Sequence, residues 1–254
     1  MGFLHEGHLS LVRESKKKCD ITIVSIFVNP AQFAPSEDFK NYPRNFDRDK
    51  QLLENEGVDF LFLPDEREIY PYNFQTYVTT EQITQKLEGE FRPTHFRGVT
   101  TVVLILFNSV QPDYAFFGQK DAQQYAVIEQ MVTDLKLPVK IVECPIVREK
   151  DGLAMSSRNV YLTPEERTKA LALHKALLYG GKLIEGKEIH PQVVIDNMKA
   201  IISEEKFIKL DYVAIVNAYG FRAVDLIDEG NEYYILIACK IGKTRLIDNI
   251  KIRI

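Results

Sequence analysis

The sequence predicts an α/β fold with parallel strands, followed by a smaller α+β part. Over residues 1–146, short apolar segments rich in β-branched residues alternate with segments of helical length and periodicity. From residue 147 onward, two helical segments come first and three strand segments separated by turns follow. We therefore expect a Rossmann-like, doubly wound parallel sheet in a domain of residues 1–146, and a smaller C-terminal α+β domain of residues 147–254.

Four strands are expected in the first domain, because each apolar segment is nearly continuous, as in a strand that is buried on both faces. They cover residues 21–28, 58–64, 113–118 and 139–146. Helices are expected at residues 9–18, 42–57, 99–108 and 122–135. The third of these is apolar around nearly its whole circumference, which predicts a buried helix. Residues 68–71 are expected to form a turn, and residues 77–89 an edge strand and a short helix.

The second domain contains a clear helix start. Thr163, Pro164 and Glu166 suit the N-cap, first-turn and capping-box positions of a helix that we expect to run to about residue 181. A further helix is expected at residues 191–205, and strands at residues 211–216, 233–239 and 244–252.

Composition and charge exclude several classes of protein. Of 254 residues, 45% are hydrophobic and 27% are charged, as in an ordinary globular protein, and the net charge is −4. Nucleic-acid-binding domains usually carry a basic stripe, so we expect no nucleic-acid partner. No apolar run is long enough to span a membrane, and three widely spaced cysteines form no disulfide framework. We therefore expect a cytoplasmic protein without a membrane partner.

Two histidines lie three residues apart at the start of the chain. His5 and His8 flank Gly7 just before the expected helix at residues 9–18, so they share one face of its N-terminus. The free N–H groups and the dipole of a helix N-terminus favour anions, and the arrangement suits the polyphosphate of a nucleotide. On spacing alone, a solvated or core pair is the alternative. Zinc is not expected, because helical zinc pairs normally use i, i+4 spacing and need a third ligand.

Further polar segments follow the expected strands at their carboxyl ends, where open α/β sheets bind ligands. Gln32 lies in a proline-containing loop, where it could contact a substrate or cap the loop. Lys120 precedes a helix start and can place a charge on a phosphate, while Asp121 also suits an N-cap. Gln123 and Gln124 begin that helix, and one of them could reach the same cleft.

A polar loop over residues 147–159 places two hydroxyls and a guanidinium in consecutive positions, at Ser156, Ser157 and Arg158. Such a loop can close over phosphates with charge-assisted hydrogen bonds from the arginine. Taken alone, a surface linker is the alternative.

Five stretches in one order resemble the pantoate–β-alanine ligases, a family within the nucleotidyltransferases that carry an HxGH motif. They are residues 1–8, 27–33, 95–99, 117–124 and 151–159. The histidine motif alone would indicate only the wider superfamily, but the Gln32 loop and the KDxQQ stretch that begins at Lys120 narrow the resemblance. The resemblance rests on motifs up to about residue 162. Beyond that residue, it rests on the size and layout of the chain.

The resemblance implies a ligase that forms a carbon–nitrogen bond in the synthesis of pantothenate (vitamin B5), in the coenzyme A pathway. The pantoate carboxylate would attack the α-phosphate of MgATP to give pantoyl adenylate and pyrophosphate, and the amine of β-alanine would then displace AMP. ATP would enter as a substrate with Mg²⁺, no tightly bound organic cofactor is expected, and the metal ligands stay unknown.

The resemblance also implies roles for individual residues. The expected catalytic residues are His8, His5, Lys120, Ser156, Ser157 and Arg158, with His8 as the catalytic donor. The expected ATP-binding residues are Met1, Gly2, Phe3, Leu4, His5, Glu6, Gly7, His8, Gly118, Gln119, Lys120, Asp121, Val147, Met155, Ser156, Ser157 and Arg158. Gln32 and Gln124 would hold pantoate or β-alanine, and a buried amide pair would reject acids without the pantoate hydroxyls. Arg92 could contact substrate or form a structural salt bridge.

A homodimer is a further implication of the resemblance, and so is a start that lacks about one strand and one helix. In a doubly wound fold, a phosphate-binding turn should follow a strand, and here no segment precedes the turn. One alternative is another HxGH nucleotidyltransferase, against which Gln32 and Gln124 argue. The other is a truncated, inactive nucleotide-binding protein, against which the intact motifs argue.

Overall fold

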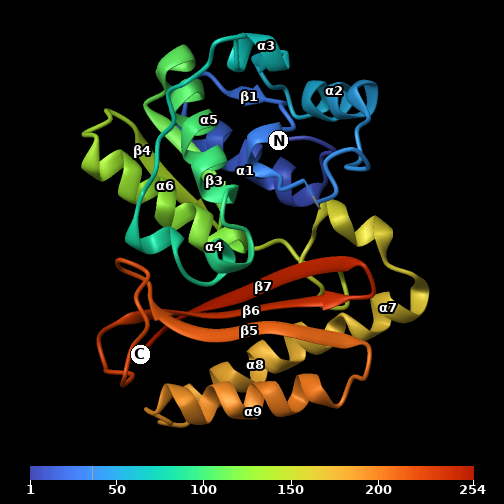
Figure 1. Cartoon of the computed structure of the whole chain (residues 1–254), viewed down its shortest axis with the longest axis vertical. Coiled ribbons are helices and arrows are strands. Elements are labelled where there is room, and N and C mark those ends of the chain that lie inside the picture. The colour runs from blue at the N-terminus through green and yellow to red at the C-terminus, as the bar shows by residue number, and fades with distance from the viewer. Residues whose placement is uncertain (36) are drawn as a thin grey trace. The chain divides into compact units, whose positions relative to one another are not determined.

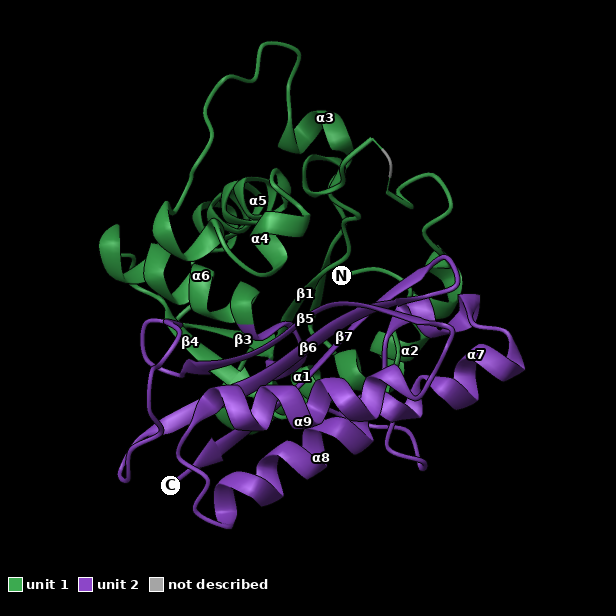
Figure 2. Cartoon of the chain, turned by 60° about the horizontal axis from the view of Figure 1, so that its bottom comes forward, with its two compact units in different colours: residues 1–118, 123–145 green, residues 119–122, 146–254 purple. Residues whose placement is uncertain are grey.

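The computed structural model describes residues 1–35 and 37–254, and the chain divides into two compact units (Figure 2). The first unit comprises residues 1–118 and 123–145, and the second comprises residues 119–122 and 146–254. The second unit therefore includes a turn of four residues that the sequence assigns to the first domain.

Parallel strand pairs form the framework of the first unit (Figure 1). β1 (Ile23–Ser25) pairs with β2 (Phe60–Phe62), and β3 (Tyr114–Gly118) pairs with β4 (Lys140–Cys144). A helix joins the strands of each pair, α2 (Phe46–Asn55) in one and α6 (Ala122–Asp134) in the other. These βαβ units confirm the expected α/β class, and the four strands lie in two separate two-stranded sheets.

The other helices of the first unit are α1 (Glu6–Lys18), α3 (Glu66–Ile69), α4 (Glu88–Phe91) and α5 (His95–Val110). Short 3₁₀ turns are η1 (Pro30–Gln32) and η2 (Gln82–Thr84). The expected burial of α5 is confirmed for its amino-terminal half, where Val99, Val102 and Val103 pack with Ile128 and Met131 of α6. A second small core joins α1 to β1 and α2.

Two expectations for the segment between β2 and α5 are wrong. The turn expected at residues 68–71 is instead the short helix α3, which a capping box between Asp65 and Glu68 stabilises. Residues 77–89 form no strand in the described structure, and at Val78 side chains of α5 take both main-chain hydrogen bonds. The Val78 N–H donates to Thr101 Oγ1 at 3.0 Å, and Thr100 Oγ1 donates to the Val78 carbonyl at 2.6 Å.

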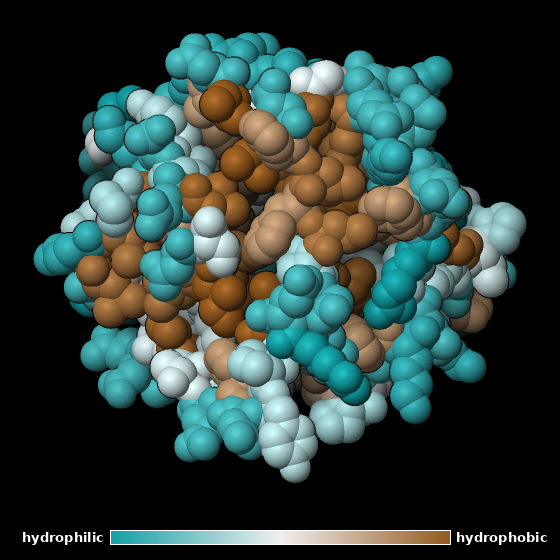
Figure 3. Space-filling model, turned by 90° about the horizontal axis from the view of Figure 1, so that it is seen from above, coloured by the Kyte–Doolittle hydropathy of each residue, from teal (hydrophilic) through white to brown (hydrophobic). Residues whose placement is uncertain are grey.

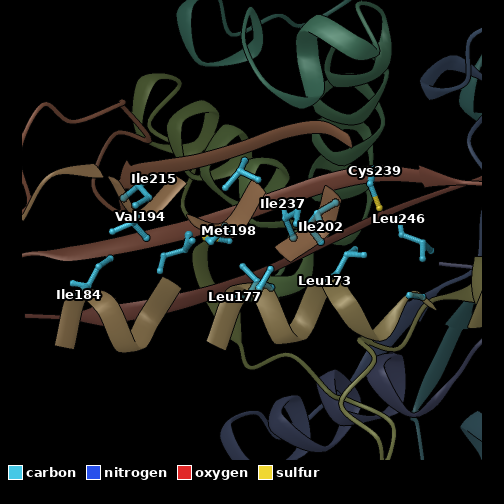
Figure 4. Close-up of a cluster of buried hydrophobic side chains, with 14 of the residues drawn as sticks. Leu173, Leu177, Ile184, Val194, Met198, Ile202, Ile215, Ile237, Cys239 and Leu246 are labelled. Carbon is cyan, nitrogen blue, oxygen red and sulfur yellow. The ribbon is translucent and has the colours of Figure 1, made fainter. Parts of the chain in front are cut away.

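The second unit is an antiparallel sheet covered by helices. β5 (Ile208–Asn217), β6 (Glu232–Ile241) and β7 (Thr244–Arg253) pair in the order β5-β6-β7. α8 (Leu171–Glu185) and α9 (Pro191–Ser203) pack on the sheet through one large apolar core (Figure 4). The single helix expected from Thr163 is two helices, since α7 (Pro164–Lys169) ends at Ala170 before α8 begins. This architecture confirms the smaller α+β part.

Among the helices of the described residues, none has both the length and the apolar character that crossing a membrane requires.

Candidate active site

The histidine pair lies where the sequence places it, at the N-terminus of α1. His5 is the N-cap, and its Nδ1 accepts a hydrogen bond from the Gly7 N–H at 3.2 Å. The His8 Nδ1 accepts one from the His5 N–H at 3.2 Å, which completes a reciprocal capping box. The two rings are adjacent, with centroids 4.0 Å apart. Because each Nδ1 is an acceptor, each neutral ring carries its proton on Nε2, where it can donate to an anion.

A buried carboxylate fixes the turn that precedes these histidines. Asp49 of α2 is 1% exposed, and its Oδ1 accepts a hydrogen bond from the Leu4 N–H at 2.8 Å. Arg48 donates to the Leu4 carbonyl at 2.8 Å, and its guanidinium lies over the ring of Phe3. Phe3 has a φ of +48°, a left-handed conformation that costs energy for a side chain of this size. These contacts offset the cost of this conformation.

The first two residues lie along the end of β1. The Met1 amino group donates to the Ser25 carbonyl at 3.0 Å, and the Met1 carbonyl accepts from the Phe27 N–H at 2.9 Å. A Cβ atom on Gly2 would approach a methyl group of Val28 to 2.9 Å, so a larger residue here would force Val28 to shift. The structure thus keeps residues 1–8 together as one continuous segment.

Gln32 lies in η1, and its neighbour Asn29 organises the turn. Asn29 is buried, its Oδ1 accepts from the Ala31 N–H and from the Tyr70 hydroxyl, and its Nδ2 donates to the Gly98 carbonyl at 3.0 Å. A Cβ atom on Gly98 would come within 2.4 Å of the Ala31 carbonyl oxygen. Only glycine therefore allows α5 to approach this turn so closely.

Arg92 and His95 hold the main chain of Gln32. The Gln32 carbonyl accepts from His95 Nδ1 at 3.1 Å and from Arg92 Nη2 at 3.3 Å. Arg92 also donates to Glu37 through Nε and Nη2, at 2.5 and 3.2 Å. The sequence left two roles open for Arg92, a substrate contact or a structural salt bridge, and the structure shows the salt bridge. No sequence pattern indicated Glu37 as its partner, because the two residues lie 55 positions apart.

His95 is neutral in this cluster. Its Nε2 accepts from Arg92 Nη1 at 3.2 Å, which leaves Nδ1 as the donor to Gln32. Burial, together with the charge of Arg92, lowers the pKa of His95 to about 4. Burial alone would raise the pKa of Glu37, but the hydrogen bonds and charge of Arg92 hold it below its usual value.

The two consecutive glutamines of α6 have different environments. Gln123 is 4% exposed and bonds fully to main-chain groups, donating to the carbonyls of Ile83 and Lys86 and accepting from the Glu88 N–H. Gln124 is half-buried, and within the described residues its amide makes no hydrogen bond. The geometry thus leaves Gln124, rather than Gln123, available for a ligand.

The Lys120 turn is η3 (Gln119–Asp121), which belongs to the second unit. Lys120 Nζ lies 3.7 Å from Asp121 Oδ1, a loose pair that leaves the ammonium able to reach an anion. Gly118 ends β3, and a Cβ atom built on it would meet nothing within 4 Å, so the space beside this residue is open.

The loop over residues 147–159 folds back on itself within the second unit. Met155 N–H donates to the Val147 carbonyl at 3.0 Å, so these two candidates lie together. Ser156 is the N-cap of η4 (Ser157–Tyr161), and its Oγ accepts from the Arg158 N–H at 3.2 Å. Ser157 is buried, while Ser156 and Arg158 are half-buried. The structure therefore orders this segment as a capped turn rather than an extended linker.

No group of three or more histidine, cysteine, aspartate or glutamate side chains is arranged to hold a metal ion in the described part of the chain. The candidates that bear charge or N–H donors are His5, His8, Lys120 and Arg158. Two of these residues lie in each unit, and their groups are of the kinds that bind anions, with phosphate the anion that both helix starts and guanidinium groups favour.

Known proteins resemble this chain over nearly its whole length. A family model described as Pantoate-beta-alanine ligase matches residues 1–251. A pantothenate synthetase from Caldicellulosiruptor bescii is 55% identical over 250 residues, which cover 98% of this chain and 88% of that protein. One from Pseudothermotoga lettingae is 52% identical over 249 residues, which cover 98% and 88%.

Solved structures show the same similarity. A pantothenate synthetase from Thermus thermophilus superposes with a TM-score of 0.95 at 42% identity, covering 100% of this chain and 91% of that one. A pantoate-beta-alanine ligase from Francisella tularensis, described as complexed with beta-gamma ATP and beta-alanine, gives a TM-score of 0.79 at 34% identity. That match covers 98% of this chain and 86% of the other.

Proposed function

Since this chain belongs to the pantoate–β-alanine ligase family, we propose that it joins pantoate to β-alanine with ATP, giving pantothenate, AMP and pyrophosphate. The observation that carries the proposal is the histidine pair at the start of α1. Both Nδ1 atoms cap the helix, so both rings are oriented with Nε2–H as the donor. Two oriented donors beside a helix N-terminus suit the phosphates of ATP.

The first step would be adenylation of pantoate. A carboxylate is a poor acyl donor until one of its oxygens becomes part of a good leaving group, and attack on the α-phosphate of MgATP achieves this with loss of pyrophosphate. Negative charge on the transferring phosphoryl group would be stabilised by His5 and His8 and by the cations Lys120 and Arg158. Because helix capping fixes the two histidine rings before reaction, these donors need little reorganisation as the charge develops.

The second step would be attack of the β-alanine amine on the acyl carbon, which forms the amide bond and releases AMP. Gln32 and Gln124 are the residues we propose to hold pantoate. Two observations support these roles: Arg92 and His95 donate hydrogen bonds to the Gln32 carbonyl, and the Gln124 amide makes no hydrogen bond to the described part of the chain. An acid without the pantoate hydroxyls would leave such amides unpaired, so it should react poorly.

We propose that ATP is bound by the same residues that the family resemblance implies. They are Met1, Gly2, Phe3, Leu4, His5, Glu6, Gly7, His8, Gly118, Gln119, Lys120, Asp121, Val147, Met155, Ser156, Ser157 and Arg158. Ser156 and Ser157 are proposed to help stabilise the phosphates. We also propose that residues 1–146 form a nucleotide- and pantoate-binding domain and that residues 147–254 form a lid domain.

Exchange of labelled pyrophosphate into ATP tests this function directly. We expect exchange only when pantoate is present, and release of pantothenate and AMP only when β-alanine is added as well. A carboxylic acid of similar size without hydroxyls serves as the control and should support little exchange. Exchange that does not depend on pantoate, or AMP release without both substrates, would overturn the ligase proposal in favour of another nucleotidyltransferase.

We also propose a homodimer that works in the cytoplasm with MgATP. Figure 3 shows apolar side chains at the surface of one face of the molecule, and in the first unit Ile21, Ile23 and Phe60 are each at least 42% exposed. Exposed apolar surface of this kind is typical of an interface. The three cysteines are free, which fits a reducing compartment. Sedimentation equilibrium would test the dimer, and a monomer at micromolar concentration would contradict it.

A further inference from the structure

One asparagine on the edge strand of the second unit is bonded to the turn that carries Lys120. Asn249 of β7 donates through Nδ2 to the Gln119 carbonyl at 2.9 Å and to the Lys120 carbonyl at 3.0 Å. Its Oδ1 accepts from Gln119 Nε2 at 3.1 Å. Every hydrogen-bonding atom of the Asn249 amide is therefore directed at this one turn.

The two carbonyls that Asn249 binds belong to consecutive peptide planes. The Gln119 carbonyl lies in the peptide before the Lys120 Cα, and the Lys120 carbonyl lies in the peptide after it. Fixing both planes fixes φ and ψ of Lys120, and these angles set the direction in which its Cβ leaves the main chain. The side chain of Asn249 thus restricts the direction in which the Lys120 side chain leaves the main chain.

Asn249 is itself rigidly held. It is 1% exposed, its N–H donates to Asp248 Oδ1 at 2.7 Å, and its carbonyl accepts from Arg148 Nη2 at 3.1 Å. Arg148 and Asp248 form a two-point ion pair with distances of 2.7 and 3.0 Å, and Arg148 also donates to the Gly152 carbonyl. Bidentate pairs of this kind fix geometry as well as charge. The amide of Asn249 is therefore fixed in position before any ligand binds.

We propose that Asn249 is a positioning residue for Lys120 in the adenylation step, acting through the main chain of the Gln119–Lys120 turn. This inference rests on the proposed function, in which Lys120 contacts the ATP phosphates. The second unit contains residues 119–122 as well as β7, so both partners of this contact belong to one unit although β3 of the first unit leads into the turn. Asn249 touches neither substrate nor phosphate in this proposal.

A four-member cycle of the parent, Asn249→Ala, Lys120→Ala and the double variant tests the proposal. The rate of pantoate-dependent pyrophosphate release would be measured against the concentrations of ATP and pantoate. We expect Asn249→Ala to lower kcat/KM for ATP by at least about tenfold, because small misplacements of catalytic groups are costly. We expect the KM for pantoate to stay within about twofold, since Gln32 and Gln124 lie outside the second unit.

The decisive quantity is the effect of the second change in the Lys120→Ala background. If Asn249 acts through Lys120, adding Asn249→Ala there should cost less than about twofold. Equal losses in both backgrounds, or a matching rise in the KM for pantoate, would overturn the proposal. If Lys120→Ala alone leaves activity unchanged, the role of Lys120 in the proposed function fails instead, so the two failures are distinguishable.

Two further variants guard against simple loss of folding. Asn249→Asp keeps the size of the side chain but turns an oxygen toward both carbonyls, so it should lower kcat/KM for ATP at least as much as alanine. Gln119→Ala removes only the bond to Oδ1 and leaves both Nδ2 donors in place, so its effect should be smaller. Thermal unfolding identifies any variant that is not folded at the assay temperature, and a folded Asn249→Asp variant with parental kinetics would contradict the proposal.

Discussion

Different interactions stabilise the two units of this protein internally. The second unit has three strands of 10 residues each and one continuous apolar core that includes Leu177, Met198 and Ile237 (Figure 4). The first unit has strands of three or five residues and two small cores. Its loops are fixed instead by single side chains bonded to the main chain, such as Asp49 to Leu4 and His95 to Gln32.

This difference has a physical consequence for substitutions. Apolar burial is spread over many contacts, so a change in the apolar core of the second unit should lower the free energy of unfolding and leave substrate binding alone. A polar bond to one carbonyl or N–H group depends on one atom, so its loss should move a candidate site residue directly. Substitutions in each unit can test whether stability and binding separate in this way.

The largest effect is expected in the first unit, for His8→Ala. Loss of the Nε2 donor should lower the rate of adenylate formation by about 10²- to 10⁴-fold, measured by pyrophosphate exchange. The His8 Nδ1 also caps α1, so His8→Asn, which can still accept from the His5 N–H, separates the two roles. If His8→Asn retains the parental rate, His8 serves only as a cap.

The next effect is expected in the core of the second unit. Leu177 of α8 is fully buried, and Leu177→Ala should lower the free energy of unfolding by about 2–5 kcal/mol, measured by urea denaturation. Leu178 on the same helix is 48% exposed, so Leu178→Ala is a matched control with an expected change within about 0.5 kcal/mol. Activity per folded molecule should match the parent in both variants. A large rise in KM for either variant would contradict the proposed separation of stability from binding.

A third effect concerns pH. The pKa of His95 is lowered from 6.5 to about 4 in the folded protein, so between these values the unfolded chain binds a proton that the folded chain does not. The contribution of His95 to stability is therefore complete above about pH 6.5 and should fall by about 3 kcal/mol as the pH drops toward 4. Arg92, Glu37 and Glu88 are the charged groups that act on this ring.

Urea denaturation of the parent and His95→Asn at about pH 7 and about pH 4.5 measures this contribution. The variant lacks the titrating ring, so its stability should change less over this interval, whatever the carboxylates contribute to both proteins. Equal pH dependence in the two proteins would show that His95 titrates normally.

The smallest effects come from the neighbouring glutamines of α6. Gln123→Ala removes three bonds from a buried side chain to main-chain groups and should cost about 1–3 kcal/mol of stability with little change in KM. Gln124→Ala should have the opposite result, a pantoate kcat/KM that is lower by about tenfold with stability within about 0.5 kcal/mol of the parent. A reversed pattern would assign the substrate contact to Gln123.

Local sequence patterns predicted the elements that contain their own start signals or continuous apolar segments. The capping box of Thr163 and Glu166 is present at α7, and the buried character of α5 begins at its first turn. The strand expected at residues 21–28 is real but short, because only Ile23–Ser25 has a pairing partner in β2. The break at Ala170 could not be predicted, since no glycine or proline marks it.

The candidate site was predictable where its residues are close in sequence, as in the pair His5 and His8 and the run at residues 156–158. The supporting residues were not, because their partners are distant. Asp49 supports Leu4 from 45 positions away, and Asn249 holds Lys120 from 129 positions away. Periodicity and spacing carry no information about such pairs, and only the folded chain brings them together.

The short turn at residues 119–122 limits how this protein can be divided for experiments. A fragment that starts at residue 146 would contain the whole antiparallel sheet and both long helices, yet the amide of Asn249 would have lost both of its carbonyl acceptors. Joining residues 118–123 to such a fragment through a short glycine linker is a more suitable design for isotope labelling of one half. The same reasoning makes this turn a poor choice for a tag insertion or a circular permutation site, although it lies in a connecting segment.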